Sequence, residues 1–251
     1  MRKYGPWALI AGASEGIGAA FARSLSAQGL NVVLVARRRE PLTALASALP
    51  GQSRVISCDL ATDLPQVYAE TADLEVGLVV ANAAYSPIGV FTEAPEEDLN
   101  RALDLNCRVP MLLARHFLPG MVARGRGGLI VMSSLAGSQG SPGIAAYAGT
   151  KAFDAVFAES LWGEVRGTGV DVLTCVAGAV STPGLASATA KAAPGTVTPE
   201  VVVAAALRAL GKRPRVVPGS LMRFSSVLMS RVLPRRTAIT VMGRASRDVL
   251  G

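Results

Sequence analysis

Four polar residues, Asn106, Ser134, Tyr147 and Lys151, could together make a carbonyl group easier to reduce by hydride. Tyr147 and Lys151 form the centre of this group, because they are four residues apart and a helix would place them one above the other on a single face. A neighbouring ammonium favours the phenolate form of a tyrosine. We therefore expect Lys151 to make Tyr147 a usable general acid or base.

A hydride source is indicated by a glycine-rich run, Gly12-Ala13-Ser14-Glu15-Gly16-Ile17-Gly18, between a short apolar segment and a helix-like one. Glycines at such a turn let the backbone approach a pyrophosphate, and the helix N-terminus offers free N–H groups to the anion. A glycine run alone is a weak signal. Between a first strand and a first helix it predicts a dinucleotide site.

Basic residues follow the second apolar segment, in the run Val35-Ala36-Arg37-Arg38-Arg39. An acidic residue here would bind the ribose hydroxyls and repel a 2′-phosphate, whereas arginine pairs with that phosphate. We therefore predict that Arg37 and Arg38 select NADP(H) over NAD(H). The alternative is a solvated, basic start of a helix.

The elements that must position these residues alternate along the chain. Short runs rich in Val, Ile and Leu predict buried strands at 7–11, 31–35, 54–57, 76–81, 128–132, 170–176 and 215–217. Helical spacing predicts helices at 18–28, 39–49, 96–124, 145–166 and 199–210. The alternation predicts one doubly wound, Rossmann-like α/β domain over residues 1–251, with about seven parallel strands and helices on both faces. Residues 184–198 are the one long segment with the composition of a loop.

Composition excludes several other kinds of chemistry. Half of the 251 residues are hydrophobic and 17% are charged, which is typical of a packed globule. Cys58, Cys107 and Cys175 have no CxxC spacing and are expected to be small buried residues in a reducing compartment. His116 is the only histidine and lies in an apolar, helix-like run, so we expect it to be structural and predict no metal site.

The termini and the apolar runs predict a mature cytoplasmic protein. The first ten residues carry two basic residues and a short apolar run, without a cleavage site after an apolar core of secretory length. No run reaches the roughly 18 uninterrupted apolar residues of a membrane-spanning helix.

Taken together, the motifs resemble those of the short-chain dehydrogenase/reductase family, and the likeness extends over almost the whole chain. Their order and spacing carry the resemblance more than any single string does. The motifs are Gly12 to Gly18, Asp59-Leu60, Asn82-Ala83-Ala84, Asn106, Ser134, Tyr147-x-x-x-Lys151 and Gly178-x-Val180-x-Thr182.

The resemblance implies a catalytic role for each member of the quartet. Tyr147 would give a proton to the carbonyl oxygen while the nicotinamide delivers hydride to the carbon. Ser134 would hydrogen-bond the same oxygen, and Lys151 would hold the nicotinamide ribose. Asn106 would anchor a water that relays protons. These roles agree with the general rule that preorganised donors aimed at developing oxyanion charge lower the barrier most.

The resemblance also implies a set of cofactor-binding residues. Asp59 and Leu60 would flank the adenine, Asn82 the adenosine ribose region, and Val180 with Thr182 the carboxamide end. The full expected set is Gly12, Ser14, Glu15, Gly16, Ile17, Gly18, Arg37, Arg38, Asp59, Leu60, Asn82, Ala83, Tyr147, Lys151, Gly178, Val180 and Thr182. Ala11, Ala84 and Ala177 depart from the family pattern, which usually has threonine, glycine and proline there, but none of them removes a reacting group.

The net charge of +7 comes from the C-terminal part of the chain. Apolar residues from Leu221 to Leu233 recur at helical spacing with arginines between them, so residues 219–251 have the pattern of a basic amphipathic helix. Such a helix can lie on an anionic membrane surface, cover the substrate pocket or pack on another subunit. Nucleic acid is disfavoured, because the chain has no recognition motif and few aromatic residues.

From these residues we expect an NADP(H)-dependent oxidoreductase that interconverts a ketone or aldehyde and an alcohol. The apolar C-terminal segment and the loop favour a hydrophobic substrate, such as a 3-oxoacyl or steroid-like compound. By analogy with the family, a homodimer or homotetramer is expected. Two alternatives are a redox-inactive, cofactor-binding regulatory protein and a peripheral membrane protein that acts through its basic segment. A nucleotide-sugar epimerase or dehydratase is disfavoured, since 251 residues leave little room for a substrate lobe.

Overall fold

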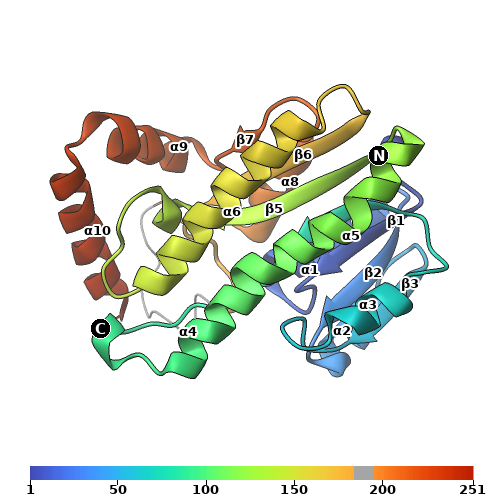
Figure 1. The fold of residues 1–251 in the computed structure, drawn as a ribbon, viewed down its shortest axis with the longest axis horizontal. Coiled ribbons are helices and arrows are strands. Elements are labelled where there is room, and N and C mark those ends of the chain that lie inside the picture. Colours follow the sequence, from blue (N-terminus) through green and yellow to red (C-terminus); the bar gives the residue numbers. More distant parts are fainter. Residues whose placement is uncertain (184–194, 251) are drawn as a thin grey trace.

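The computed structural model describes residues 1–183 and 195–250. Its centre is a seven-stranded sheet in which all neighbouring strands are parallel, in the order β3-β2-β1-β4-β5-β6-β7 (Figure 1). The strands are β1 (Trp7–Ala11), β2 (Asn31–Ala36), β3 (Ser53–Ser57), β4 (Val76–Ala81), β5 (Gly127–Ser134), β6 (Val170–Ala177) and β7 (Arg215–Val216). The predicted Rossmann-like α/β fold is therefore confirmed.

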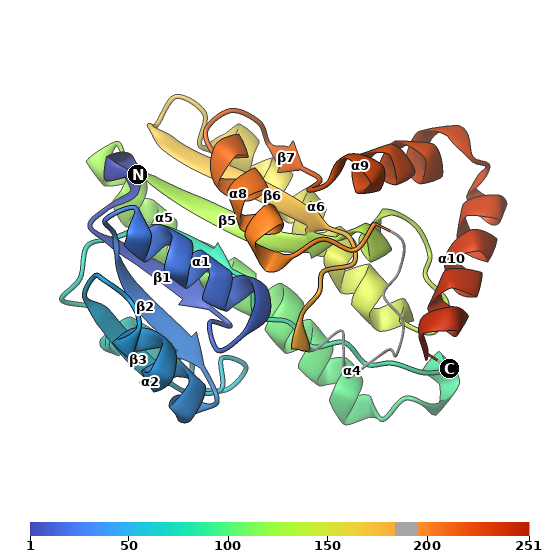
Figure 2. The same ribbon diagram turned by 180° about the vertical axis from the view of Figure 1, so that it is seen from behind.

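Helices cover both faces of the sheet, which explains why β1, β2 and β4 are almost entirely apolar. On one face lie α1 (Gly16–Ala27), α2 (Arg39–Ser47) and α8 (Pro199–Ala209) (Figure 2). Phe21, Leu42 and Val202 of these helices join one buried cluster. On the other, Val67 of α3 (Leu64–Ala69), Leu113 of α5 (Val109–Arg124) and Ala158 of α6 (Ala145–Glu164) join a second cluster. Along β1, for example, Ala8 and Ile10 enter the first cluster, and Leu9 and Ala11 enter the second.

The strand order reverses between β1 and β4. From β1 the chain winds outward through β2 and β3, and from β4 it winds the other way through β5, β6 and β7. In such sheets the crevice at the carboxyl ends of the two central strands binds ligands. Gly12 follows β1 and Asn82 follows β4, so both lie at this crevice.

The helix expected over 96–124 is interrupted in its hydrogen-bond pattern but not in its path. It consists of α4 (Glu96–Leu103), a π-helical segment (Asp104–Arg108) and α5. Such π-bulges frequently occur at functional sites. Asn106 lies at the middle of this one, and its side chain is fully buried.

Some expectations from the sequence need correction. Helix α3 was not predicted, because six residues are too short for helical periodicity to emerge. Strand β5 extends two residues beyond the predicted end, so Ser134 is the last residue of the strand rather than a residue after it. Cys58 and Cys175 are buried as expected, but Cys107 is only partly buried.

The C-terminal segment forms two helices rather than one. Helix α9 (Ser220–Val227) continues into a π-helical segment (Leu228–Val232), and α10 (Arg235–Leu250) begins after a break. The break has a simple cause: Pro234 disfavours helical backbone at the preceding residue, and Leu233 is extended, with ψ 139°. The two helices form an arm at one side of the domain (Figure 1).

The arm packs on the chain segment between Ser134 and Tyr147. Ala238 of α10 is fully buried, and a side chain at Gly140 would meet Ile239 at 3.3 Å. The guanidinium of Arg235 also donates to the carbonyl of Ser138 at 2.9 Å. In contrast, the apolar stripe of α9 does not enter the core, because Leu221 and Phe224 are 51% and 66% exposed.

One expected segment lies mostly outside the described residues. Most of the loop expected at 184–198 lies outside the described residues, but Val197 at its end forms a parallel bridge with Val180. Within residues 1–183 and 195–250, no helix has the length and apolarity that a membrane span requires.

Candidate active site

A cleft of about 540 Å³ opens at the carboxyl ends of β1, β2, β3 and β4. It coincides with the place where the strand order reverses. Most of the expected cofactor-binding residues line it: Gly12, Ser14, Glu15, Gly16, Ile17, Arg37, Arg38, Asp59, Leu60, Asn82, Ala83 and Thr182. Ala36, Cys58, Ala84 and Leu105 line it too and were not in the expected set.

The glycines of the first turn are required by close backbone approaches. Gly12 has φ +80°, and a Cβ there would meet the backbone nitrogen of Ala83 at 2.9 Å. A Cβ at Gly18 would lie 2.0 Å from the carbonyl oxygen of Gly12, so this glycine lets α1 pack against the end of β1. Asn82 closes the turn, since its side-chain amide donates to the Gly12 carbonyl at 3.0 Å.

The N-terminus of α1 faces this cleft through Gly16 and Ile17. The first N–H groups of a helix have no partner within the helix, and they carry the positive end of its dipole. In the described structure the side chain of Glu15, at the N-cap position, makes no capping hydrogen bond to these groups. The helix end is therefore suited to an anion such as a pyrophosphate.

Two ion pairs border the cleft. Arg38, after β2, pairs with Glu15 of the glycine turn, although both side chains are substantially exposed. At the other side, Arg101 of α4 donates to the carboxylate of Asp59 at 2.7 Å. Burial favours the neutral form of Asp59, but the hydrogen bonds from Arg101 and from the Ala61 N–H outweigh it and lower the pKa of Asp59.

Tyr147 and Lys151 lie one helical turn apart on α6, as expected from their spacing. The Lys151 ammonium is 5.8 Å from the centre of the Tyr147 ring. It also donates to the carbonyl of Met132 on β5 at 2.9 Å, which ties α6 to the strand that ends at Ser134. The side chain of Lys151 is only 4% exposed, so the charge is held in a dry environment.

A residue that the sequence analysis missed, Asp154, pairs with Lys151. Its carboxylate accepts a hydrogen bond from the ammonium at 2.8 Å, and its side chain is fully buried. Burial opposes the charge of Lys151, yet Asp154 and Tyr147 outweigh it and raise the Lys151 pKa. An acidic residue three positions after Lys151 in the apolar run Ala152-Phe153-Asp154-Ala155-Val156 was the available signal, because it shares the helical face of the lysine.

Asn106 joins α6 to the loop after β4. Its amide nitrogen donates to the Tyr85 carbonyl at 2.8 Å and to the Thr150 hydroxyl at 2.9 Å. Its amide oxygen accepts from the Tyr85 N–H at 2.7 Å. Both N–H donors of the side chain are therefore in use, and a water next to Asn106 would have to be held through an oxygen atom.

Ser134 ends β5 and caps the following turn, because its hydroxyl accepts a hydrogen bond from the Ala136 N–H at 3.2 Å. The neighbouring Ser133 donates to the carbonyl of Lys151 at 2.7 Å. This turn packs closely on α6, since a Cβ at Gly137 would meet the Ala152 nitrogen at 2.5 Å. The end of β5 and the helix of Tyr147 are thus held together.

Five residues of the expected cofactor-binding set do not line the cleft: Gly18, Tyr147, Lys151, Gly178 and Val180. A side chain at Gly178 would meet the Met222 sulfur at 2.5 Å, so the glycine lets α9 pack over the end of β6. The side chain of Val180 is buried in the core. The bridge to Val197 is made by the peptide groups of Ala179 and Ser181, so the peptide groups of Val180 itself point to the other side.

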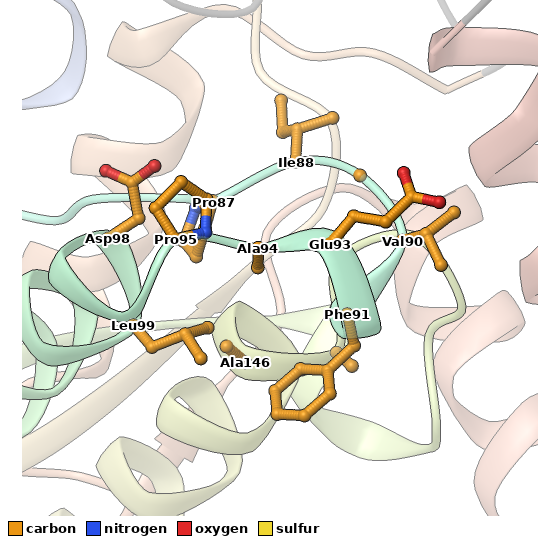
Figure 3. Close-up of a pocket in the computed structure, with 12 residues that line it drawn as sticks. Pro87, Ile88, Val90, Phe91, Glu93, Ala94, Pro95, Asp98, Leu99 and Ala146 are labelled. Carbon is orange, nitrogen blue, oxygen red and sulfur yellow. The ribbon is translucent and has the colours of Figure 1, made fainter.

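A second cavity of about 180 Å³ lies between the loop after β4, α4 and the start of α6. Figure 3 shows that Phe91, Leu99 and Ala146 gather on one side of it. Ala145 and Ala146, the residues just before Tyr147, form part of its wall. The loop also exposes Ile88, Val90 and Phe91 by 50%, 60% and 57%, so its surface is apolar.

The residues present fit a nicotinamide dinucleotide. The cleft offers an open helix N-terminus for the pyrophosphate, a glycine turn without side chains in the way, and arginines at the end of β2. Tyr147 and Lys151 stand on α6, beside the strand that ends at Ser134.

Comparison with known proteins agrees with this geometry. The family model described as short chain dehydrogenase matches residues 6–193, which include the glycine turn, Ser134, Tyr147 and Lys151. A 7β-hydroxysteroid dehydrogenase from Collinsella aerofaciens is 33% identical over 229 residues, which are 86% of this chain and 87% of that protein.

Solved structures give the same result. One from work on the stereoselectivity of a 7β-hydroxysteroid dehydrogenase has a TM-score of 0.90 at 31% identity and covers 96% of this chain and 98% of the other. A short-chain dehydrogenase from Sphingobium yanoikuyae in complex with NADPH has a TM-score of 0.79 at 27% identity, with coverage of 91% and 96%. The chain therefore belongs to the short-chain dehydrogenase family and is an oxidoreductase that acts on CH–OH groups.

Proposed function

We propose that the protein catalyses NADP(H)-dependent interconversion of a lipophilic ketone and the corresponding alcohol, with Tyr147 as the general acid and base. The observation that carries this proposal is the buried Lys151 ammonium, which lies 5.8 Å from the centre of the Tyr147 ring and is tied to β5. A fixed positive charge beside a phenol favours the phenolate, which the tyrosine must become when it gives up its proton.

Each member of the quartet has a defined task in this proposal. A nicotinamide cofactor, when bound, supplies or accepts the hydride. Tyr147 holds the proton that reaches the carbonyl oxygen in reduction, and Ser134 donates a hydrogen bond to the same oxygen, which stabilises developing negative charge. Lys151 holds the nicotinamide ribose. Asn106 positions a proton-relay water through an oxygen atom, because both of its side-chain donors are engaged.

The preference for NADP(H) rests on Arg37 and Arg38. Both line the cleft after β2, where a 2′-phosphate would be paired by a guanidinium. Glu15 already pairs with Arg38, so a phosphate there would compete with that carboxylate. The similarity to a short-chain dehydrogenase solved with NADPH supports the assignment.

The proposed substrate class rests on the second cavity, whose wall includes Ala145 and Ala146, just before Tyr147. Most of the residues that line it have apolar side chains, with Glu93 and Asp98 as the exceptions, and the loop that forms one wall exposes Ile88, Val90 and Phe91. A hydrophobic carbonyl compound would cover this surface on binding. The similarity to 7β-hydroxysteroid dehydrogenases and to a very-long-chain 3-oxoacyl-CoA reductase supports steroid-like and 3-oxoacyl compounds as the first substrates to examine.

A homo-oligomer is part of the proposal. The outer face of α6 exposes Val156 by 63% and Phe153 by 37%, and Met111 on α5 is 42% exposed. Phe153 stacks on Phe157 at 5.5 Å, so the aromatic part of this face is already ordered. A second copy of the chain would remove this apolar surface from water.

A direct test is to follow NADPH oxidation with a panel of lipophilic ketones and NADP⁺ reduction with the matching alcohols. Binding of NADPH is measured separately by its fluorescence and shows that the purified protein is folded and can bind the cofactor. Turnover of at least one hydrophobic pair supports the proposal. If NADPH binds but no ketone or alcohol in a broad panel reacts, the redox-inactive alternative replaces it.

A further inference from the structure

Asp154 is a fully buried carboxylate in a helix whose neighbouring positions are apolar. One of its oxygens, Oδ2, accepts the hydrogen bond from Lys151 at 2.8 Å. The other, Oδ1, is buried and has no hydrogen-bond partner among the described residues. A buried carboxylate that leaves one of its two oxygens without a hydrogen bond is costly. Among the described residues, the charge of Lys151 compensates for this cost.

The hydrogen bonds of Lys151 fix the position of its ammonium group. A lysine ammonium has three N–H donors. One is directed to the carbonyl of Met132 on β5 and one to Asp154. A single donor is left for the side of Tyr147 and the proposed nicotinamide ribose. The pair therefore fixes both the place of the ammonium and the direction of its last donor.

Charged and titratable groups around the pair come from two elements. Tyr147, on α6 itself, favours the charged form of Lys151, and Cys107, on the π-helical segment, faces both Lys151 and Asp154. Burial raises the Asp154 pKa to about 6, although Lys151 pulls it the other way. Burial also raises the pKa of the Cys107 thiol to about 11, so the thiol is neutral at pH 7. Around neutral pH the site thus holds an ionised Lys151–Asp154 pair.

We propose that Asp154 is a positioning residue, which holds the Lys151 ammonium in the place and orientation needed to act on Tyr147 and on the cofactor ribose. This inference rests on the proposed function, because it assigns Asp154 a task in the same reaction. An ion pair of this kind often adds little net stability compared with apolar residues of the same volume. The effect of the Lys151–Asp154 pair should therefore be measured on the Kd for NADPH and on the pH dependence of kcat, and not only on thermal stability.

The test compares wild type with Asp154→Asn, which keeps an acceptor of nearly the same shape but removes the charge. The control is Ala158→Gly, further along α6, which weakens the helix by about 1 kcal/mol without changing a charged group. For each protein, the Kd for NADPH is measured by fluorescence between pH 5 and pH 8. The pH profile of kcat for ketone reduction is measured alongside.

At pH 8 we expect the Kd of Asp154→Asn to exceed that of wild type by about tenfold, a usual coupling between residues in direct contact. The ratio should approach one at pH 5, because Asp154 is then protonated in wild type and both side chains are neutral. Titration of the NADPH phosphate affects both proteins equally and cancels in the ratio. A ratio near one at pH 8 would overturn the inference.

If Asp154→Asn is too unstable to purify, variants in a Lys151→Met background provide a second test of the inference. Asp154→Leu in the Lys151→Met background removes both charges and leaves no unpaired carboxylate. If Asp154 acts through Lys151, the double variant should bind NADPH no more weakly than Lys151→Met alone. A further loss of affinity in the double variant contradicts the inference. Because these readouts are binding constants, they remain valid even if no substrate is found and the proposed reaction fails.

Discussion

Asn106 and Tyr85 exchange two hydrogen bonds, from the Tyr85 N–H to the Asn106 amide oxygen at 2.7 Å and from the Asn106 amide nitrogen to the Tyr85 carbonyl at 2.8 Å. They join the π-helical segment to the loop after β4, which forms a wall of the second cavity. Replacing Asn106 with Leu should lower the free energy of unfolding by about 3 kcal/mol, because the Tyr85 peptide groups lose their partners. Chemical denaturation measures this loss. A loss of unfolding free energy below about 1 kcal/mol would mean that the hydrogen bonds between Asn106 and Tyr85 contribute little to stability.

Tyr147→Phe should lower kcat by about 10³-fold, because it removes the proposed proton donor while leaving the ring in place. The Kd for NADPH should change little. Tyr85→Phe is a matched control, since it also removes one hydroxyl, which donates to Asp98 at 2.6 Å. Steady-state kinetics on the best ketone of the panel separate the two variants. Equal activity of Tyr147→Phe and wild type would favour the redox-inactive alternative.

The double replacement Arg37→Ala with Arg38→Ala should weaken NADPH binding by about 10- to 100-fold and leave NADH binding nearly unchanged, since only NADPH carries the phosphate. Glu15→Gln should act in the opposite direction, because it releases Arg38 from its ion pair. Fluorescence titration with both cofactors measures the two effects, and Arg39→Ala provides the control. An equal loss for NADPH and NADH would show that the phosphate lies elsewhere.

The Arg101–Asp59 pair should make stability depend on acid pH. Because the Asp59 pKa is lowered on folding, its contribution is present above the unfolded value of about 3.9 and is lost as pH falls through the folded value. Arg101→Met should therefore lower Tm at pH 7, by an amount that corresponds to at most about 1 kcal/mol, and the difference from wild type should shrink below pH 4.

Arg108→Met is the control for this comparison, because Arg108 is more exposed and its distance to Asp104 is 3.7 Å. Its Tm should follow that of wild type at every pH. A difference between Arg101→Met and wild type that persists at pH 3 would mean that Arg101 stabilises the fold by packing and not by its charge.

Val156→Glu should reduce self-association, because it places a charge in the exposed apolar face of α6. Light scattering after size-exclusion chromatography measures the mass of wild type and variant. We expect a dimer or tetramer for wild type and a smaller species for the variant. Glu159→Gln on the same helix is a suitable control, since it changes a charge that pairs with Arg215 at 2.7 Å. A monomeric wild type would contradict the proposed oligomer.

Much of the framework could be predicted because it depends on residues close together in the chain. Continuous apolar runs identified the strands, and helical spacing placed Tyr147 and Lys151 on one face of α6. The glycine turn was recognisable because its place between β1 and α1 sets what the backbone must do there. Short elements such as α3 escaped, since six residues do not establish a period.

The sequence by itself determined the order of the elements, the fold class and the four residues proposed for catalysis. Only the tertiary structure decided which distant groups meet: Asn106 with Tyr85, Arg101 with Asp59, Arg38 with Glu15 and α10 with the segment before Tyr147. It also showed that Asp154 turns inward to Lys151, although both lie on one helix. The physical reason is that periodicity along a chain specifies which faces are apolar, whereas the partner of a buried charge depends on how those faces pack.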